Sequence, residues 1–326
     1  MAEPAPQLTV VAPVFNEAEN IDPLLARLRP VLERCGLPYE IILVDDGSQD
    51  GTLGHIRAAH AADPRVRGLS FSRNFGKEIA IAAGLDAARG AAVVIMDSDL
   101  QHPPETIEQM VALWRQGYQN IYGVRRSRSG DSRVRQALTQ RFYRLFDRFG
   151  ETALPPGAGD FRLLDRVAVN ALNRMRERAR FSKGLYAWIG FKSIGVPFDV
   201  AERASGTSKF TYSKLTRFAL DGLMSFSTIP LMVWTFVGVV ISVIALAMAL
   251  YFVGQTILYG VDVPGFATLV VSVTFFAGVQ LLSLGVLGEY IGRIFAEVKG
   301  RPLYLVAESI GETGGPPDAQ SVTDGA

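Results

Sequence analysis

The feature that most constrains this chain is a pair of long uncharged segments in its last third. Residues 228–253 and 266–288 contain no Asp, Glu, Lys or Arg. A helix needs about 20 apolar residues to cross a bilayer, and a buried helix of a soluble core rarely runs this long without one charged residue facing water. The sequence therefore predicts two C-terminal transmembrane helices, at residues 228–254 and 266–288.

Basic residues flank this pair of segments but do not lie between them. The flanking residues are Lys209, Lys214 and Arg217 before the first segment, and Arg293, Lys299 and Arg301 after the second. Because cytoplasmic flanks collect positive charge during insertion, both termini are predicted to be cytoplasmic. The N-terminus has no secretory signal pattern, and a single cysteine, Cys35, fits a reducing compartment. We therefore expect a multi-pass protein of the inner (plasma) membrane with its first two-thirds in the cytosol.

Short apolar runs alternate with helical patterns through the first half of the chain. The expected strands are residues 8–15, 39–44, 66–71, 92–96 and 120–124. The expected helices are residues 21–35, 52–62, 77–89 and 105–116, with a further helix at 165–178. This alternation is typical of an α/β fold with a mainly parallel sheet. Ligands of such sheets bind beyond the carboxyl ends of the strands, so the residues after each strand are the candidates for a site.

Three other segments complete the expected organisation. Residues 208–227 mix Phe and Leu with Lys and Arg, which is typical of an amphipathic helix in the membrane interface. Residues 132–150 are expected to form an arginine-bearing helix, which favours a phosphate site near a membrane over binding of nucleic acid. The chain thus divides into a soluble domain at 1–207, an interfacial segment, two spans and a cytoplasmic tail at 289–326. From Ser309 this tail is expected to be disordered.

Two carboxylates after the fourth expected strand are candidates for holding a metal ion. Asp97 and Asp99 would point to opposite faces of a strand, so both can serve only if they lie on a turn. Mg²⁺ or Mn²⁺ takes a few carboxylate oxygens and fills its shell with phosphate and water, which an exposed Asp-x-Asp turn permits. A solvated turn without function is the alternative. His55, His60 and His102 lack the spacing of a metal site, and we interpret them as surface or structural residues.

Acidic residues also follow the second expected strand. Asp45 and Asp46 can accept hydrogen bonds from a nucleobase or from ribose hydroxyls. Gly47 permits a sharp turn and a close approach of the backbone to a ligand. The alternative role of this loop is helix capping by Ser48 or Asp50.

Two further residues have two interpretations each. Glu17, after the first expected strand, is either a ribose contact or an ordinary acid of a first helical turn. Trp188 either lines an acceptor site or belongs to the core.

Several ordered motifs resemble a known family. The strings VVAPVFNE, YEIILVDDGSQDGT and AAVVIMDSDLQHPPE resemble the nucleotide-sugar domain of glycosyltransferase family 2, which has the Rossmann-like GT-A fold. The strings GAGDFRLLD, FSKGLYAWIGF and ERASGTSKF, with two apolar segments behind them, resemble the polyprenyl-phosphate glycosyltransferases. These include the bactoprenol glucosyltransferases and, more distantly, the dolichol-phosphate mannose synthases.

The resemblance implies roles for particular residues. Those implied to hold the metal and the diphosphate are Asp97, Asp99 and Gln101. Those implied to surround the nucleoside are Pro13, Glu17, Asp45 and Asp46. Asp160 would lie beside the acceptor as a base or a positioning group. Those implied to bind the lipid phosphate are Arg125, Arg203 and Lys209, a role that cations close to a bilayer support independently.

The resemblance also implies a reaction. A lipid phosphate oxygen would attack the anomeric carbon of a nucleotide-sugar, which inverts, while Mg²⁺ or Mn²⁺ stabilises the departing nucleoside diphosphate. The GDFRL and FGKEIA strings look closer to the glucosyltransferase branch, so UDP-glucose is the expected donor and polyprenyl phosphate the expected acceptor. Resemblance to two-span relatives suggests a homotetramer.

Two other functions compete with this expectation. A processive polysaccharide synthase usually carries a Gln-x-x-Arg-Trp motif and more spans, and the sequence has neither. A catalytically inactive membrane scaffold or lipid-binding module would not need acids at positions 45, 46, 97, 99 and 160. Incubation with polyprenyl phosphate, Mg²⁺ and nucleotide-sugars distinguishes the three functions. A polysaccharide synthase would form a long polymer, and an inactive scaffold would form no product.

Overall fold

The structure is a computed structural model that describes residues 5–125, 158–178, 180–199, 229–259 and 265–311. The chain divides into two compact units. The first, which we call the α/β unit, comprises residues 1–218 and 301–326, and the second, the helical unit, comprises residues 219–300.

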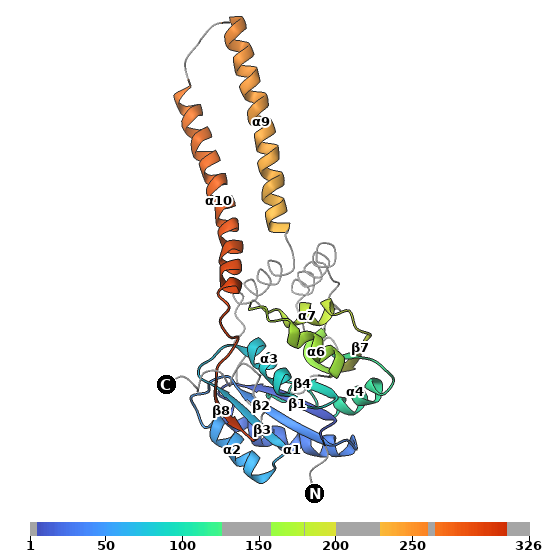
Figure 1. Cartoon of the computed structure of the whole chain (residues 1–326). Helices are drawn as coiled ribbons and strands as arrows, with labels where there is room; N and C mark the ends of the chain where they lie inside the picture. The colour runs from blue at the N-terminus through green and yellow to red at the C-terminus, as the bar shows by residue number, and fades with distance from the viewer. Residues whose placement is uncertain (1–4, 126–157, 179, 200–228, 260–264, 312–326) are drawn as a thin grey trace. The chain divides into compact units, whose positions relative to one another are not determined.

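An eight-stranded sheet forms the centre of the described α/β unit, in the order β7-β5-β6-β4-β1-β2-β3-β8 (Figure 1). The strands are β1 (Leu8–Val14), β2 (Tyr39–Asp45), β3 (Val66–Phe71), β4 (Ala92–Ile95), β5 (Asn120–Arg125), β6 (Ala158–Asp165), β7 (Ser193–Phe198) and β8 (Val306–Ile310). β1 pairs in parallel with β2 and β4, as does β2 with β3 and β5 with β7. β6 is antiparallel to β4 and β5, and β8 to β3. The expected α/β fold with a mainly parallel sheet is confirmed.

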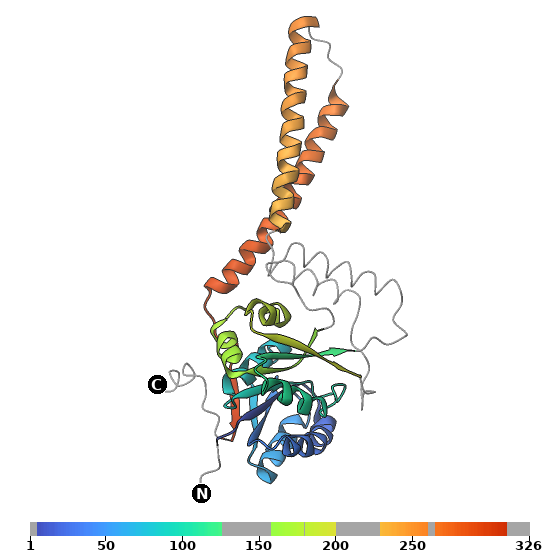
Figure 2. The same cartoon turned by 90° about the vertical axis from the view of Figure 1, so that its right-hand side faces the viewer.

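Helices cover both faces of this sheet (Figures 1 and 2). They are α1 (Ala18–Arg34), α2 (Thr52–Ala62), α3 (Lys77–Ala87), α4 (Thr106–Trp114), α6 (Arg166–Arg174) and α7 (Ser182–Trp188). Side chains alternate along a strand, and Val10 on β1 packs in one core cluster with residues of α1, α2 and α4. The neighbouring Val11 faces α3, where a Cβ on Gly84 would lie 2.2 Å from its Cγ1. Glycine at this position therefore lets α3 approach the sheet closely.

The elements expected from the sequence are largely present. Each of the five expected strands begins and ends within one residue of its predicted bounds. The helix expected at 165–178 is shorter, because α6 ends at Arg174 and Met175 is already extended. Three strands were not predicted: β6, β7 and β8.

The C-terminal segment corrects one expectation. Ser309 and Ile310 were expected to be disordered, but they belong to β8. Ile310 is buried over Gly68, where a Cβ would lie only 3.1 Å from Ile310 Cδ1, and Glu308 forms an ion pair with Arg57. β8 was not predicted, because the surrounding residues are rich in Gly, Pro and acids and because its partner strand, β3, lies far away in the sequence.

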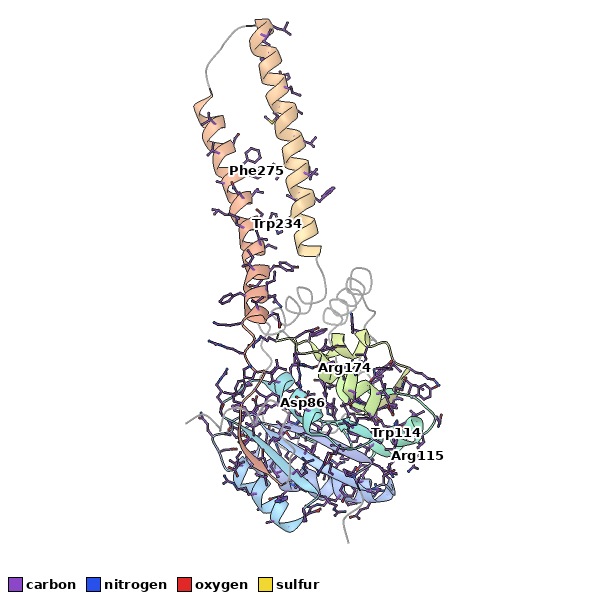
Figure 3. The ribbon with its side chains drawn as sticks, viewed as in Figure 1. Asp86, Trp114, Arg115, Arg174, Trp234 and Phe275 are labelled. Atoms are coloured by element: carbon purple, nitrogen blue, oxygen red, sulfur yellow. The ribbon has the colours of Figure 1, made fainter. Side chains whose placement is uncertain are left out.

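The helical unit contains α9 (Ile229–Tyr259) and α10 (Phe266–Val298) in its described residues. One described stretch, Phe275–Val298, is long and apolar enough to cross a membrane, and none of it is buried inside the structure. Many apolar side chains of both helices are exposed, among them Phe275 of α10, which is labelled in Figure 3. The expected spans are thus helical, and their number stays a prediction.

Several expectations fall outside the described residues. They concern the arginine-bearing helix at 132–150, the interfacial segment at 208–227, Arg203 and Lys209.

Candidate functional site

One edge of the sheet gathers most of the candidate residues. β1, β2, β3 and β4 run parallel, so the residues that follow them share the edge at their carboxyl ends. β6 is antiparallel to β4, which places the beginning of β6 at the same edge. The register pairs Ile95 with Arg162. When it is continued by two residues on each chain segment, Asp97 comes opposite Asp160.

Lys77, the first residue of α3, bridges these two carboxylates. Its Nζ lies 2.6 Å from Oδ1 of Asp97 and 3.1 Å from Oδ2 of Asp160. Burial alone would lower the pKa of Lys77, but the two carboxylates outweigh burial and raise the pKa above its ordinary value. Its ammonium group is therefore charged at neutral pH, and it offsets the repulsion between the two facing carboxylates.

Asp160 is a mostly buried carboxylate with cations around it. Burial would raise its pKa, but Lys77, Lys183 and Arg162 together hold the pKa below its ordinary value. Its Oδ1 atom is buried and accepts no hydrogen bond from the described residues. A buried acceptor without a donor is costly, so the charge of Asp160 is balanced by the nearby cations and not by a hydrogen bond to this oxygen.

The Asp-x-Asp segment lies on a turn, which its two carboxylates need if both are to face one ligand. Asp97 follows the end of β4, and the Oδ1 atom of Asp99 accepts the backbone N–H of Gln101 at 3.1 Å. Leu100 has φ of 57° in this turn. Left-handed backbone is unfavourable for leucine by about 1–2 kcal/mol. Such strained positions are often found where a turn presents functional side chains.

Asp97 and Asp99 fit a metal ion that substrate phosphates complete. Among the described residues, no group of three or more His, Cys, Asp and Glu side chains could enclose a metal. Mg²⁺ and Mn²⁺ do not need such a cage when phosphate and water fill their shell. Oδ1 of Asp97 already forms an ion pair with the Lys77 ammonium, whose Nζ lies 2.6 Å away. The roles of Asp97, Asp99 and Gln101 as ligands stay a prediction.

Asp45 and Asp46 have partners within the chain. Asp45 accepts hydrogen bonds from the Ser48 N–H and the Ser70 hydroxyl. Asp46 accepts from the backbone N–H groups of Phe75 and Gly76, at 2.7 and 2.9 Å. Burial, the largest effect, raises the pKa of Asp46. This carboxylate thus holds the turn that leads into Lys77, while its contact with a nucleoside stays a prediction.

The turn at Gly47 approaches another loop closely. A Cβ on Gly47 would lie 2.5 Å from the Arg73 carbonyl carbon, and the expected approach of this backbone to a ligand stays a prediction. The capping alternative is wrong as stated, because the N-cap of α2 is Gly51, although Asp50 before it accepts the Thr52 N–H on Oδ1 at 3.0 Å. Ser48 instead accepts the Asn16 N–H on its hydroxyl.

Glu17 and Pro13 flank this edge on β1 and α1. Glu17 precedes α1, and its carboxylate accepts the side-chain amide of Asn20. Glu17 is the N-cap residue of α1 and not an acid of its first turn, where Glu19 lies, and a ribose contact stays a prediction. Pro13 is buried in β1 beside Val44.

Further polar residues around Asp160 attach α7 to α3 and β6. Glu78, next to Lys77, accepts hydrogen bonds from the N–H and the hydroxyl of Ser182 at the beginning of α7. Arg162 is 2 % exposed and its guanidinium lies 3.5 Å from the centre of the Tyr186 ring. Burial lowers the pKa of Arg162 and raises that of Tyr186. α7 is thereby fixed behind the site.

His102 borders the site from the loop after β4. Its ring stacks on Phe161 at 4.9 Å and meets Phe198 edge-on at 5.5 Å. Burial lowers the pKa of His102 although Asp97 and Asp99 raise it, so the ring is neutral at neutral pH. Its structural interpretation holds, as does the surface interpretation of His55, which pairs with Asp22. A core position for Trp188 is wrong, because its side chain is 55 % exposed.

The three cations expected to bind a lipid phosphate are described only in part. Arg125 ends β5, is exposed, and lies at the same edge as Asp97, because β4 and β5 are both antiparallel to β6. Arg203 and Lys209 lie outside the described residues, so their place beside Asp160 stays a prediction.

Comparison with known proteins decides the family. The family model described as glycosyl transferase family 2 matches residues 9–172. A glycosyltransferase of Synechocystis that carries the description uncharacterized is 49 % identical over 302 residues, covering 93 % of this chain and 95 % of the relative. The chain belongs to glycosyl transferase family 2. It is therefore a glycosyltransferase, and its sheet is of the GT-A type.

Two further similarities accompany this family assignment. A prophage-derived bactoprenol glucosyl transferase of Shigella flexneri is 41 % identical over 303 residues, covering 93 % of this chain and 98 % of the relative. A mannosyltransferase of Pyrobaculum calidifontis, solved with GDP-mannose and Mn²⁺, matches with a TM-score of 0.45 at 20 % identity, covering 66 % of this chain and 61 % of the mannosyltransferase.

Sequence reasoning missed Lys77, Glu78 and Arg162 as parts of the family 2 site. Their signal was weak but present: in FGKE the lysine and the glutamate begin the helix after the third strand, and the string GDFRL places an arginine two residues after Asp160, where an apolar run begins. A lysine at the first turn of a helix is usually a surface residue without a specific partner, and only the positions of Asp97 and Asp160 show that this half-exposed lysine bridges two carboxylates.

Proposed function

We propose that this family 2 enzyme transfers one glucose from UDP-glucose to a polyprenyl phosphate at the cytoplasmic face of the membrane. The observation that carries the proposal is the pair of facing carboxylates, Asp97 and Asp160, bridged by Lys77. Asp97 belongs to the turn proposed for the donor diphosphate, and Asp160 belongs to the strand proposed to face the acceptor. Donor and acceptor groups would thus meet within one side-chain length.

The donor side rests on the turn from Asp97 to Gln101. Asp97, Asp99 and Gln101 would hold Mg²⁺ or Mn²⁺, which supplies charge stabilisation to the leaving diphosphate. The left-handed backbone at Leu100 fixes the direction of this turn before any ligand arrives. Pro13, Glu17, Asp45 and Asp46 would surround the nucleoside, with the Asp46 carboxylate also holding the loop before α3.

The acceptor side rests on Asp160. An alkyl phosphate has a second pKa of about 6 and is already largely ionised at neutral pH, so little proton removal is needed. The pKa of Asp160 lies below its ordinary value, and the ionised carboxylate would orient the acceptor rather than carry a proton away. Arg125, Arg203 and Lys209 would balance the charge of the phosphate. Attack from this side would invert the anomeric carbon.

The choice of acceptor and sugar follows the relatives. Proteins named as bactoprenol glucosyl transferases match nearly the whole chain at about 41 % identity. The apolar helices support a membrane location for the acceptor, and two spans with cytoplasmic termini and a homotetrameric assembly complete the proposal.

The test is a transfer assay with the purified full-length protein, polyprenyl phosphate, Mg²⁺ and labelled nucleotide-sugars. We expect one glucose per lipid from UDP-glucose. A long polymer would show a polysaccharide synthase, and no product with any nucleotide-sugar would show an inactive scaffold. Either result overturns the proposal.

Site variants sharpen this test. Asp99→Asn and Asp160→Asn should each reduce kcat about a hundredfold or more, because each removes a charge that acts at the reacting groups. Asp22→Asn is the matched control, since the Asp22 side chain is 69 % exposed and pairs only with His55 among the interactions seen in the described residues. Circular dichroism should show folded protein for all three. Near-normal turnover of Asp99→Asn would count against the metal assignment.

A further inference from the structure

Lys77 occupies the position where positive charge is most needed in the site. Its ammonium touches Asp97 and Asp160 at once, at 2.6 and 3.1 Å. The Asp46 carboxylate fixes the backbone immediately before it, through the N–H groups of Phe75 and Gly76. A long flexible side chain on a fixed backbone can release its partners without any change in the fold.

The contact with Asp97 conflicts with a metal at the same oxygen. A divalent ion such as Mg²⁺ binds carboxylate oxygens at about 2.0–2.1 Å, and the ammonium already holds Oδ1 of Asp97 at hydrogen-bonding distance. Two cations around one carboxylate also repel each other. The ion and the ammonium therefore compete for Asp97.

We propose that Lys77 is a displaceable internal cation, which bridges Asp97 and Asp160 in the donor-free enzyme and leaves Asp97 when a divalent ion enters with the nucleoside diphosphate. This inference rests on the proposed function only in taking Asp97 as a metal ligand. Without the diphosphate, the ion must displace the ammonium and receives only protein oxygens in return. With the diphosphate, phosphate oxygens complete the shell of the ion and offer the ammonium a new anionic partner.

Metal binding should thus depend on the nucleotide because of Lys77. The test is a titration of Mn²⁺ into the full-length protein without nucleotide, with free Mn²⁺ measured by electron paramagnetic resonance. Lys77→Met should bind Mn²⁺ at least about tenfold more tightly than the wild type, which corresponds to about 1.4 kcal/mol. Lys77→Arg, which keeps the cation, should stay close to the wild type.

Two lysines serve as controls. Lys183 lies near enough to lower the pKa of Asp160 and forms no ion pair with it among the described residues. Lys192 lies over the Tyr118 ring, away from the two carboxylates. Lys183→Met should tighten Mn²⁺ binding clearly less than Lys77→Met, and Lys192→Met should not change it. Equal gains for Lys183→Met and Lys77→Met would overturn the proposal, because they would show a general charge effect instead of displacement.

A double variant tests whether the tighter Mn²⁺ binding of Lys77→Met depends on Asp97. In the double variant with Asp97→Asn, the effect of Lys77→Met should vanish, since the contested ligand is gone. A gain that persists there, or no gain in Lys77→Met itself, overturns the proposal. Thermal unfolding of each variant verifies that the folded protein is being titrated.

The metal titration and the transfer assay can refute the role of Lys77 and the proposed function independently of each other. Mn²⁺ binding uses neither lipid nor sugar, so displacement by Lys77 can hold even if the acceptor is not a polyprenyl phosphate. Conversely, glucose transfer to the lipid with unchanged Mn²⁺ affinity in Lys77→Met refutes only the role of Lys77.

Discussion

At the scale of single residues, Gly47 sets the path of the loop beneath the site. Its φ is 73°, in the left-handed region, and an added Cβ would meet the backbone of Arg73 at 2.5 Å. The loops after β2 and β3 therefore touch through a position where only hydrogen fits. Asp46, the residue before it, bonds the same second loop at Phe75.

Gly47→Ala is expected to lower stability by about 1–3 kcal/mol, because it adds both backbone strain and a clash with fixed backbone. The measurement is the midpoint of thermal unfolding. Gly54→Ala is the control: Gly54 lies in α2 with no atom within 4 Å of an added Cβ, so alanine should leave the midpoint equal or higher. A Gly47→Ala protein as stable as the control would contradict the close packing of the two loops.

The same scale shows which site residues could be predicted from the sequence. Asp97 and Asp99 could be named as candidates because an acidic pair after an apolar run is visible in the local sequence. The turn on which they lie was predicted because only a turn lets both carboxylates face one ligand. Lys77 was not found, because its partners are 20 and 83 residues away in the chain. Asp46 was found as an acid but not as the residue that holds the loop before Lys77, since its hydrogen-bond donors are set by tertiary contacts.

At the scale of elements, Glu40 ties together three strands at the end of the sheet opposite the site. It accepts hydrogen bonds from Thr9 on β1, from Arg67 on β3 and from the Arg89 N–H after α3. Glu40 and Arg67 are each 2 % exposed. Burial would raise the pKa of Glu40, but the Arg89 N–H, Arg67 and Thr9 outweigh it and lower the pKa below 4.5.

Glu40→Gln should destabilise the α/β unit by about 3 kcal/mol at neutral pH, because it leaves the buried Arg67 without a counter-charge. The lowered pKa means that the native state favours the ionised form, so this stability is present above 4.5 and is lost as pH falls through the lowered value. The difference in unfolding midpoint between wild type and variant should therefore shrink on acidification. Glu33 is exposed, so Glu33→Gln should leave the unfolding midpoint unchanged at neutral and at acidic pH. An effect of Glu40→Gln that does not depend on pH would contradict the ion pair between Glu40 and Arg67.

Elements were predicted where periodicity was clear and missed where it was broken. The first five strands are short apolar runs, and each was placed within one residue. β6 was missed because it carries charged residues: Asp160 belongs to the candidate site, and the buried Arg162 donates hydrogen bonds to Asn120 and to the Gly159 carbonyl. β7 was missed because it contains Gly195 and Pro197, which are residue types that indicate a turn in a sequence. In the structure, β7 pairs in parallel with β5.

At the scale of the whole molecule, the arrangement across the membrane is testable with the chain's own chemistry. Cys35 is the sole cysteine and is buried, so a new thiol can be labelled with little background. In intact cells, Asp262→Cys, at a position between the two apolar segments in the sequence, should react with a membrane-impermeant maleimide. Ala58→Cys on the exposed face of α2 should react only after permeabilisation. Labelling of Ala58→Cys in intact cells, or of neither variant, would contradict two spans with cytoplasmic termini.

The family and the α/β class were readable from the sequence at this scale, because both depend on ordered local motifs. The course of the chain was not, since the helical unit at residues 219–300 is inserted between two parts of the α/β unit. The last part returns with β8 beside β3, where the Ser72 N–H donates to the Leu305 carbonyl at 3.0 Å and Tyr304 stacks on Phe71.

This return has a consequence for biosynthesis. The ribosome makes both long apolar helices before it makes the strand that covers the outer edge of β3, so that edge stays unpaired until residues 306–310 have been made. A gene shortened before the first apolar segment would yield a sheet that can never be closed, and such a product should aggregate. A soluble version therefore has to keep residues 301–311, joined to the α/β unit by a short linker in place of the helices.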